Sequence, residues 1–230
     1  MGQYAETVRF LALLLASLPV GHSVQGRVLR PVILGHAARP LLVVGCIHGS
    51  EPAGLAISSE LVRAGAAPGT EIVVLPALNP DGCFRLGTRQ NAHGVDLNRN
   101  FPSNWAPIGR RGSLQWSGPR PLSEPESRYF AALVRALHPS VTVFFHQHEN
   151  VVRAWGRSRA TARRFARLLG GVLPYRDERW PYGTASNWQN HAFPGTASFV
   201  VELPAGPVPA RLVPRYVRAL RALARIGFVR

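Results

Sequence analysis

A histidine and a glutamate three residues apart, His48 and Glu51, follow the apolar run 41–47. When residues i and i+3 lie on one helical turn they share a face, so an imidazole nitrogen and a carboxylate oxygen can reach the same point. Two such ligands from one turn, a third from a distant segment and an open position for water describe a catalytic zinc site. The pair alone is a weak signal, because the same spacing arises by chance at many exposed helix starts.

The third ligand is expected at His146, which ends an apolar strand predicted over 141–145. His148 lies two residues further on and would face the same side of an extended strand, so it is the alternative ligand or a neighbour of the metal-bound groups. A histidine at the end of a strand that makes only structural hydrogen bonds is the interpretation that involves no metal.

Glu202 lies within the otherwise apolar segment 199–203. A charged group in a buried strand must be paired, bound to a metal or shifted in its pKa. A general base beside a zinc-bound water meets this requirement. A buried ion pair with one of the arginines meets it equally well.

Asp96 offers a carboxylate that could bind the far ring nitrogen of a zinc-bound histidine, an interaction that fixes the tautomer. Arg89 and Arg99 flank it and could each grip a carboxylate through two hydrogen bonds. The chain has 27 basic residues that are all arginine, so an ordinary surface charge is the competing interpretation for each.

The residues with chemistry follow the ends of predicted strands. Strands are expected at 28–34, 41–47, 71–78, 141–145 and 197–203, and helices at 52–66, 123–137, 160–169 and 209–226. Alternation of strands with helices predicts an α/β sandwich around a mostly parallel sheet. Active sites in such folds gather outside the carboxyl ends of the strands, where His48 and His146 would lie.

The region 79–121 is long, irregular and rich in Asn, Gly, Arg and Pro, and loops of this length inside a compact domain are usually functional. Ser123 and Glu126 have the spacing of a capping box, in which Ser123 caps the helix that follows and Glu126 bonds back to the amide of Ser123.

The composition favours a single globular domain with a full core, since the chain has 230 residues of which 46% are hydrophobic. The formal net charge is +15. The arginines recur at near-helical spacing and are not interleaved with aromatic residues, so we expect solvated helix faces and no nucleic-acid partner. Attraction to an anionic cell wall or membrane is a secondary interpretation.

The N-terminal segment 1–20 contains an apolar stretch, 10–20, that is too short for an ordinary membrane span. It resembles the core of an export signal, although Glu6 lies where positive charge is usual and no clear cleavage site follows. A packed N-terminal helix is the alternative. We therefore lean to an exported or cell-envelope protein over a cytoplasmic one, with no stable membrane span, and with 21–230 as the catalytic domain.

Cys46 and Cys83 do not make a disulfide scaffold, nor the spacing of a zinc site. They could pair, but we expect them to be small buried thiols.

The order of these motifs resembles that of the zinc carboxypeptidases of the carboxypeptidase A superfamily. The matching residues are His48 and Glu51, Asn79-Pro80-Asp81-Gly82, Arg89-Gln90-Asn91, the segment 96–102, His146 and Glu202. The resemblance covers roughly 21–206, and an ordered set of this kind is far more specific than a single pattern. It implies a three-layer α/β/α sandwich with a mixed, mostly parallel sheet.

The resemblance also implies a mechanism of metal-assisted hydrolysis. His48, Glu51 and His146 would hold one Zn²⁺ per chain. Glu202 would be the general base, and Arg89 would polarise the reacting carbonyl.

The remaining roles concern the substrate, which would be a peptide with a free C-terminal carboxylate. Asn98 and Arg99 would bind that carboxylate, and Tyr182 would cap the substrate. Asp96 would be the partner of His48.

Within the superfamily the chain looks most like bacterial murein peptide amidases, which cut the amide between γ-D-glutamate and diaminopimelate in cell-wall peptides. The chain departs from the pattern at His148, where proline is expected. The rival functions are a zinc acylase of the desuccinylase or aspartoacylase type and a non-catalytic module that binds peptide ends. The sequence does not predict the oligomeric state.

Overall fold

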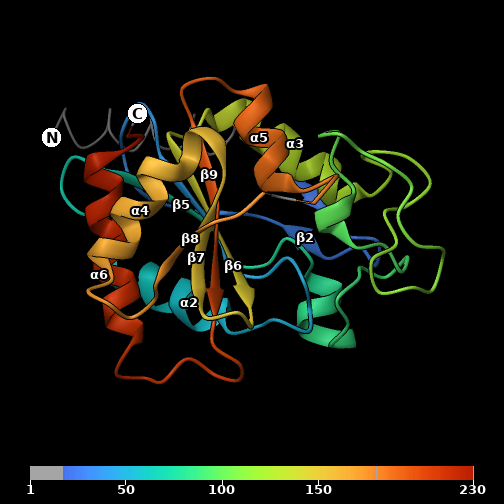
Figure 1. The fold of residues 1–230 in the computed structure, drawn as a ribbon, viewed down its shortest axis with the longest axis horizontal. Coiled ribbons are helices and arrows are strands. Elements are labelled where there is room, and N and C mark those ends of the chain that lie inside the picture. Colours follow the sequence, from blue (N-terminus) through green and yellow to red (C-terminus); the bar gives the residue numbers. More distant parts are fainter. Residues whose placement is uncertain (1–17, 180, 230) are drawn as a thin grey trace, which may run out of the picture.

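A computed structural model describes residues 18–179 and 181–229. The fold is built around a seven-stranded sheet (Figure 1). Its strands, in spatial order, are β3 (Val32–Gly35), β5 (Glu71–Leu75), β4 (Leu41–Val44), β6 (Val141–Gln147), β9 (Ala197–Leu203), β7 (Val151–Ala154) and β8 (Tyr175–Asp177). Within this sheet, the β3–β5 and β7–β9 pairs are antiparallel and the other described pairs are parallel. The predicted mixed, mostly parallel sheet is therefore confirmed.

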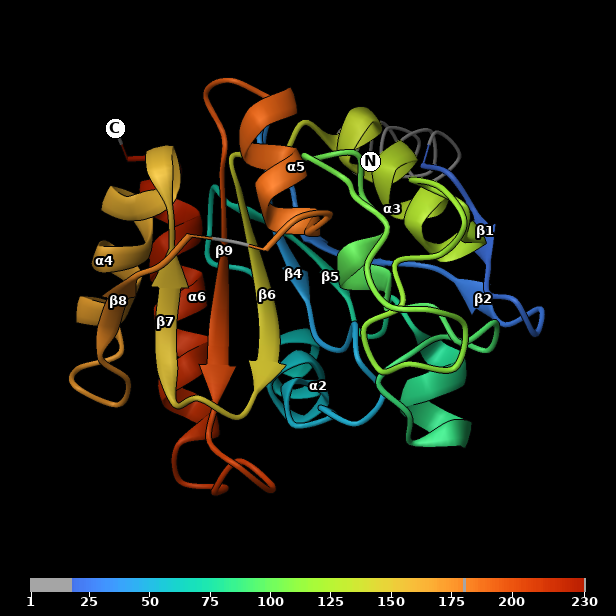
Figure 2. The same cartoon turned by 45° about the vertical axis from the view of Figure 1, so that its right-hand side comes forward.

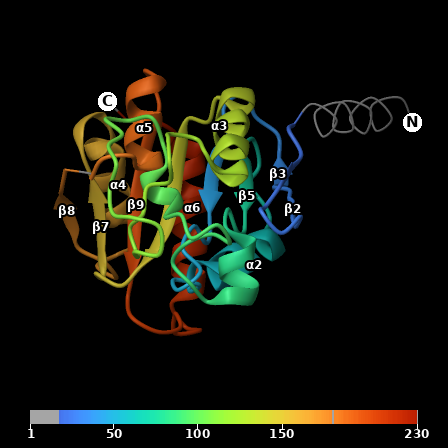
Figure 3. The same ribbon diagram turned by 90° about the vertical axis from the view of Figure 1, so that its right-hand side faces the viewer.

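Helices cover both faces of this sheet, which makes the three layers that the resemblance implied (Figure 2). One apolar core contains side chains of α2 (Gly54–Ala64), α4 (Arg159–Leu168) and α6 (Val213–Ile226). The other contains side chains of α3 (Pro125–Leu137) and α5 (Ala185–Ala192). Figure 3 shows β3 and β8 at opposite edges of the sheet.

The strands in the middle of the sheet are apolar throughout because both of their faces are covered. Val43 packs into the first core, while Leu42 and Val44 pack into the second. Successive side chains of a strand point to opposite faces, so burial on both faces requires a continuous apolar run.

Element boundaries differ from the prediction by a few residues, and several short elements were missed. The strand expected over 28–34 is split at Pro31 into β2 (Val28–Leu29) and β3, and β2 pairs instead with β1 (Gly21–His22). Proline cannot donate to a sheet ladder, so an interruption there has a direct cause. The strands β7 and β8 were missed because they are short, and α5 was missed because it is polar.

The predicted capping box is wrong. The helix α3 starts at Pro125, later than expected, and Glu124 precedes it without a side-chain cap. Ser123 donates through Oγ to the carboxylate of Glu124 at 2.7 Å. The carboxylate of Glu126 accepts the main-chain N–H of Val24 at 3.0 Å. Glu126 therefore joins segments far apart in the sequence, which a local pattern does not show.

The expectation of two buried thiols is also wrong, because Cys46 and Cys83 form a disulfide. Cys46 follows β4, and Cys83 lies in the short helix η1 (Gly82–Leu86). The two segments are in close contact: a Cβ added to Gly49 would lie 2.1 Å from the carbonyl carbon of Gly82. Glycine at position 49 lets the two backbones approach closely, beside the cysteines that bond.

Nearly all of the N-terminal segment 1–20 lies outside the described residues, so the expected export signal stays a prediction. Within the described part of the chain, no helix has the length and apolar character needed to cross a bilayer.

Candidate metal centre and active site

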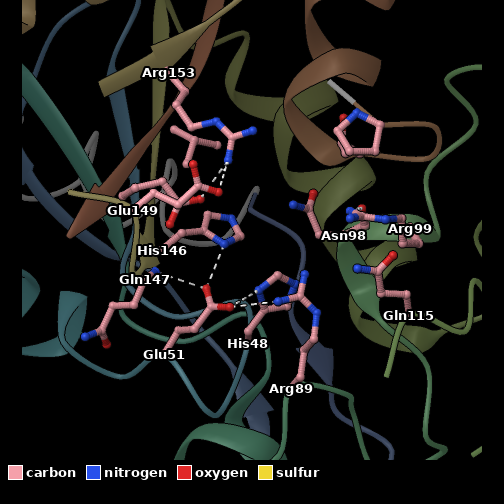
Figure 4. A pocket seen from close by; sticks show the side chains of 14 residues that line it. His48, Glu51, Arg89, Asn98, Arg99, Gln115, His146, Gln147, Glu149 and Arg153 are labelled. Atoms are coloured by element: carbon pink, nitrogen blue, oxygen red, sulfur yellow. Dashed lines mark hydrogen bonds and ion pairs between the residues drawn. The ribbon is translucent and has the colours of Figure 1, made fainter. Parts of the chain in front are cut away.

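A cavity of about 310 Å³ opens at the carboxyl ends of the central parallel strands. Three of the residues that line it come from adjacent strands. His146 lies in β6, Glu202 lies in β9, and His48 follows β4. Figure 4 shows the side chains that face it. The sequence predicted a site here, at the carboxyl ends of the strands.

Three predicted metal ligands converge in this cavity. The N–H of Glu51 donates to the carbonyl oxygen of His48 at 2.9 Å, so a tight turn before α2 carries the pair. Nδ1 of His48 lies 3.0 Å from Oε1 of Glu51, and Nδ1 of His146 lies 2.9 Å from Oε2 of the same carboxylate. The candidate ligand atoms of the three residues lie within 4.8 Å of one another.

This group of residues fits a zinc ion. Nε2 of His48 contacts Oδ1 of Asp96 at 3.0 Å, which leaves Nδ1 to face Glu51. Nδ1 is buried and, apart from its 3.0 Å contact with Glu51, has no partner among the described residues, as a nitrogen that donates its lone pair to a metal would be placed. Two imidazoles and one carboxylate are a donor set of catalytic zinc sites.

The electrostatics of the cluster keep its acids ionised. Burial works to raise the pKa of Glu51, but His48 and His146 outweigh it and hold that pKa well below its usual range. Burial is likewise outweighed at Asp96, whose pKa is held low by His48 and Arg89. Burial lowers the pKa of His48, whereas Asp96 and Glu51 raise it, with a net rise. Zinc ligation needs an ionised Glu51, which this arrangement supplies.

Arg89 is held against the same carboxylates. Its Nε donates to Oδ2 of Asp96 at 2.9 Å, and its Nη1 donates to Oε1 of Glu51 at 2.8 Å. The side chain lines the cavity, so the guanidinium reaches the predicted reaction centre, although its role in polarising a carbonyl stays a prediction.

Two other sequence candidates lie outside the cavity lining. His148 is exposed in the turn between β6 and β7, and it does not belong to the metal-ligand cluster found among the described residues. Tyr182 is 52% exposed, and it is the neighbouring Pro181 that lines the cavity.

Asn98 and Arg99 lie on the wall opposite the central strands, in the short helix η2 (Leu97–Arg99) (Figure 4). The side chain of Asp96 caps this helix by accepting the N–H of Asn98 at 2.9 Å. Oδ1 of Asn98 accepts the N–H of Ala185 at 3.0 Å. Asp96 thereby fixes both the histidine of the metal cluster and the pair predicted to bind a carboxylate.

Glu202 has features of both interpretations that the sequence left open, a general base and an ion-pair partner of an arginine. Its Oε1 accepts a bond from Nη1 of Arg153 at 3.4 Å, so it has an arginine partner. Its Oε2 is buried and makes no hydrogen bond to the described residues. In the parallel β6–β9 pairing, Glu202 is directly opposite His146, which places the carboxylate beside the metal cluster.

Comparison with known proteins decides the family. Residues 13–178 match the model of the zinc carboxypeptidase family. The chain belongs to this family.

The names of several relatives are more specific than the name of the family. Over 116 residues the chain is 34% identical to murein peptide amidase A of Escherichia coli (strain K12), covering 46% of this chain and 48% of that protein. The match therefore spans about half the length of that relative. Murein peptide amidase A of Vibrio campbellii (strain ATCC BAA-1116) is 33% identical over 151 residues, or 59% of each chain.

Solved structures agree with the family. The murein-tripeptide amidase of Escherichia coli O157 superposes with a TM-score of 0.72 and 27% identity, covering 89% of each chain. The carboxypeptidase A of Helicoverpa armigera has a TM-score of 0.75 at 19% identity, covering 96% of this chain and 72% of that one, which supports the fold.

Several residues that line the cavity of this zinc carboxypeptidase family member were not predicted from the sequence, among them Gln115, Glu149 and Arg153. Arg153 is a charged residue in the short apolar segment 151–154, and the argument that drew attention to Glu202 would have found it. Gln115 and Glu149 are polar residues in irregular segments and carry no comparable signal.

Proposed function

We propose that this zinc carboxypeptidase family member hydrolyses an amide bond next to a free carboxylate end, and that its substrate is a cell-wall (murein) peptide. One observation carries the proposal: a single cavity is lined by the metal cluster, by Glu202 and by Asn98 with Arg99. The names of the E. coli and Vibrio relatives support the narrower choice of substrate.

The substrate would be anchored by its terminal carboxylate. Arg99 is 8% exposed and keeps its guanidinium at the cavity, where Asn98 supplies an amide beside it. An arginine fork can bind a carboxylate through two charge-assisted hydrogen bonds. Anchoring at this wall would place the adjacent amide bond between Arg99 and the metal cluster, so the protein would act at a chain end.

The reaction would be an acid–base hydrolysis. A zinc ion held by His48, Glu51 and His146 would supply Lewis-acid chemistry, which polarises a carbonyl and lowers the pKa of water. Glu202 takes the proton of the attacking water at its unpartnered Oε2 and later gives it to the leaving amine. Arg89, anchored on Asp96 through Nε, presents its guanidinium to the negative charge that develops on the carbonyl oxygen.

The disulfide between Cys46 and Cys83 supports export to an oxidising compartment, since such bonds are rare in the cytosol. We propose a location in the cell envelope, where murein lies. Fractionation of cells that express the full chain, with thiol labelling before and after reduction, tests this: recovery of the protein in the cytosolic fraction, with both cysteines labelled before reduction, would contradict it.

The function is tested with zinc-loaded protein on two sets of substrates in parallel: L-Ala-γ-D-Glu-diaminopimelate and a panel of N-blocked dipeptides. Release of diaminopimelate with little release from the panel is the expected result. Release of ordinary C-terminal residues at comparable rates would replace the murein substrate by general carboxypeptidase activity. Hydrolysis of neither set, with zinc bound, would contradict the proposal and favour an acylase or a binding module.

A further inference from the structure

One end of the cavity holds an arginine surrounded by glutamates. Nη1 of Arg153 donates to Oε1 of Glu149 at 2.7 Å and to Oε1 of Glu202 at 3.4 Å, and its Nη2 donates to Glu178. Both Arg153 and Glu149 line the cavity. Figure 4 shows them on one side of His146, with Asn98 and Arg99 on the other. Opposed charges therefore face the space where a substrate anchored at Arg99 would extend.

Strand register directs Arg153 into the cavity. In the antiparallel β7–β9 pair, Val151 lies opposite Glu202 and Arg153 lies opposite Val200. Residues directly opposite, and residues two apart on one strand, share a face of the sheet. The guanidinium thus lies on the same face as Glu202, and its side chain is only 11% exposed.

We propose that Arg153 and Glu149 select the side chain of the substrate's C-terminal residue, and that this side chain ends in both a carboxylate and an ammonium group. The proposal rests on the proposed amide hydrolysis beside a carboxylate end. It adds two specificity residues to that site and the chemistry they recognise.

The charges at this end disfavour the simpler side chains. An apolar side chain would cover a guanidinium and carboxylates without replacing their water, which is costly. A side chain with only a carboxylate would approach Glu149, Glu178 and Glu202 as well as Arg153. One with only an ammonium group could pair with Glu149 but would gain no contact with Arg153. A side chain with both groups finds an opposite charge for each.

Binding would proceed by exchange of ion pairs. Glu149 is the more exposed partner of Arg153, at 44% against 33% for Glu178. The incoming carboxylate takes the place of Glu149 on Nη1 of Arg153, and the released Glu149 accepts the incoming ammonium group. Glu178 keeps the guanidinium in place on Nη2. Each charge stays paired before and after binding, so no uncompensated charge is left buried.

Four matched tripeptides, L-Ala-γ-D-Glu-X, separate the two halves of this recognition. X is diaminopimelate (both groups), 2-aminopimelate (carboxylate), lysine (ammonium) or norleucine (neither). The zinc-loaded protein should cleave the diaminopimelate peptide with the highest kcat/KM. Arg153→Gln removes a partner of Glu202, so its effect is read against the lysine peptide: kcat/KM on diaminopimelate and 2-aminopimelate should fall by about tenfold or more beyond any loss on lysine. Glu149→Gln should lower it on diaminopimelate and lysine and spare 2-aminopimelate.

The matched control is Arg176→Gln. Arg176 contacts Glu149 at 3.4 Å and Glu178 at 3.7 Å but is 57% exposed and does not line the cavity. Its loss should leave the order of the four substrates unchanged. Arg153→Lys keeps the charge but loses the paired N–H donors of the guanidinium, so its kcat/KM on diaminopimelate should lie between those of the wild type and Arg153→Gln. It replaces the Gln variant if that protein does not fold.

A second readout does not depend on turnover. Calorimetric titration with free diaminopimelate, 2-aminopimelate and lysine should give the strongest binding for diaminopimelate, weakened about tenfold or more by Arg153→Gln.

Equal losses of kcat/KM on all four peptides in the Arg153→Gln variant would overturn the proposal and leave Arg153 as a positioning residue for Glu202. Equal wild-type affinity for the three free amino acids would overturn it as well. Failure of the wild type to cleave any peptide, with diaminopimelate bound selectively, would contradict the hydrolase and leave the selectivity standing.

Discussion

His146 and Glu202 lie opposite each other on the neighbouring parallel strands β6 and β9, next to the strand that leads to His48. The sheet register therefore fixes how the predicted third metal ligand lies relative to the predicted general base. Rigid strands hold such groups more accurately than loops do. His48 and Glu51, on the turn that follows β4, complete the metal-ligand cluster.

The first prediction separates two histidines that the sequence left as alternatives. His146→Ala should remove zinc binding and activity, because it deletes one of three converging ligands. His148→Ala, a matched control two residues away and exposed, should retain one zinc per chain. Zinc content after dialysis measures both. Loss of zinc from the His148 variant with retention in the His146 variant would reverse the assignment.

The second prediction concerns Asp96, which is fully buried and joins His48, Arg89 and the N–H of Asn98. Asp96→Asn should weaken zinc affinity by about 10- to 100-fold, because the carboxylate orients His48 and raises its basicity. Competition with a coloured chelator measures the affinity. An affinity equal to that of the wild type would show that His48 needs no carboxylate partner.

The third prediction concerns the wall that would hold the terminal carboxylate. Arg99→Gln should raise KM by about tenfold or more and lower kcat less, because it removes binding that is present before the reaction begins. The control is Arg85→Gln, which changes the net charge by the same amount at an exposed site outside the cavity lining. If both variants raise KM equally, the effect is one of overall charge and not of a specific contact.

The fourth prediction concerns the disulfide, which closes a sequence separation of 37 residues. Its removal in a Cys46→Ser/Cys83→Ser variant should lower the free energy of unfolding by about 3–4 kcal/mol, through greater entropy of the unfolded chain. Zinc-loaded wild type and variant are compared by denaturant unfolding. A variant as stable as the wild type would show that the bond adds nothing to the close packing of Gly49 and Gly82.

The sequence alone predicted the fold class and most strands because buried parallel strands are continuous apolar runs. The structure brings His48, Glu51 and His146 together at the carboxyl ends of the strands, where the sequence predicted a site, and Asp96 joins them from the irregular region 79–121. The two histidines stand out as polar groups after apolar segments, and the order of the whole set resembles one family.

Other features depend on contacts between distant segments, which local patterns do not contain. Helix α5 is polar and was missed, yet Asn190 holds it to β9 by exchanging two hydrogen bonds of 2.8 Å with the main chain of Ser198. The pairing of Cys46 with Cys83 follows from the packing of two loops, and Glu126 is satisfied by Val24. In each case tertiary contacts decide the outcome.

Metal-assisted hydrolysis requires Glu202 as the proton-transferring group, and a comparison of two proteins checks this. Wild type and Glu202→Gln protein, each shown to bind one zinc, are assayed on L-Ala-γ-D-Glu-diaminopimelate. We expect equal zinc content and a loss of kcat by about 100- to 10,000-fold in the variant. Near-normal turnover by the zinc-loaded Glu202→Gln protein would contradict it.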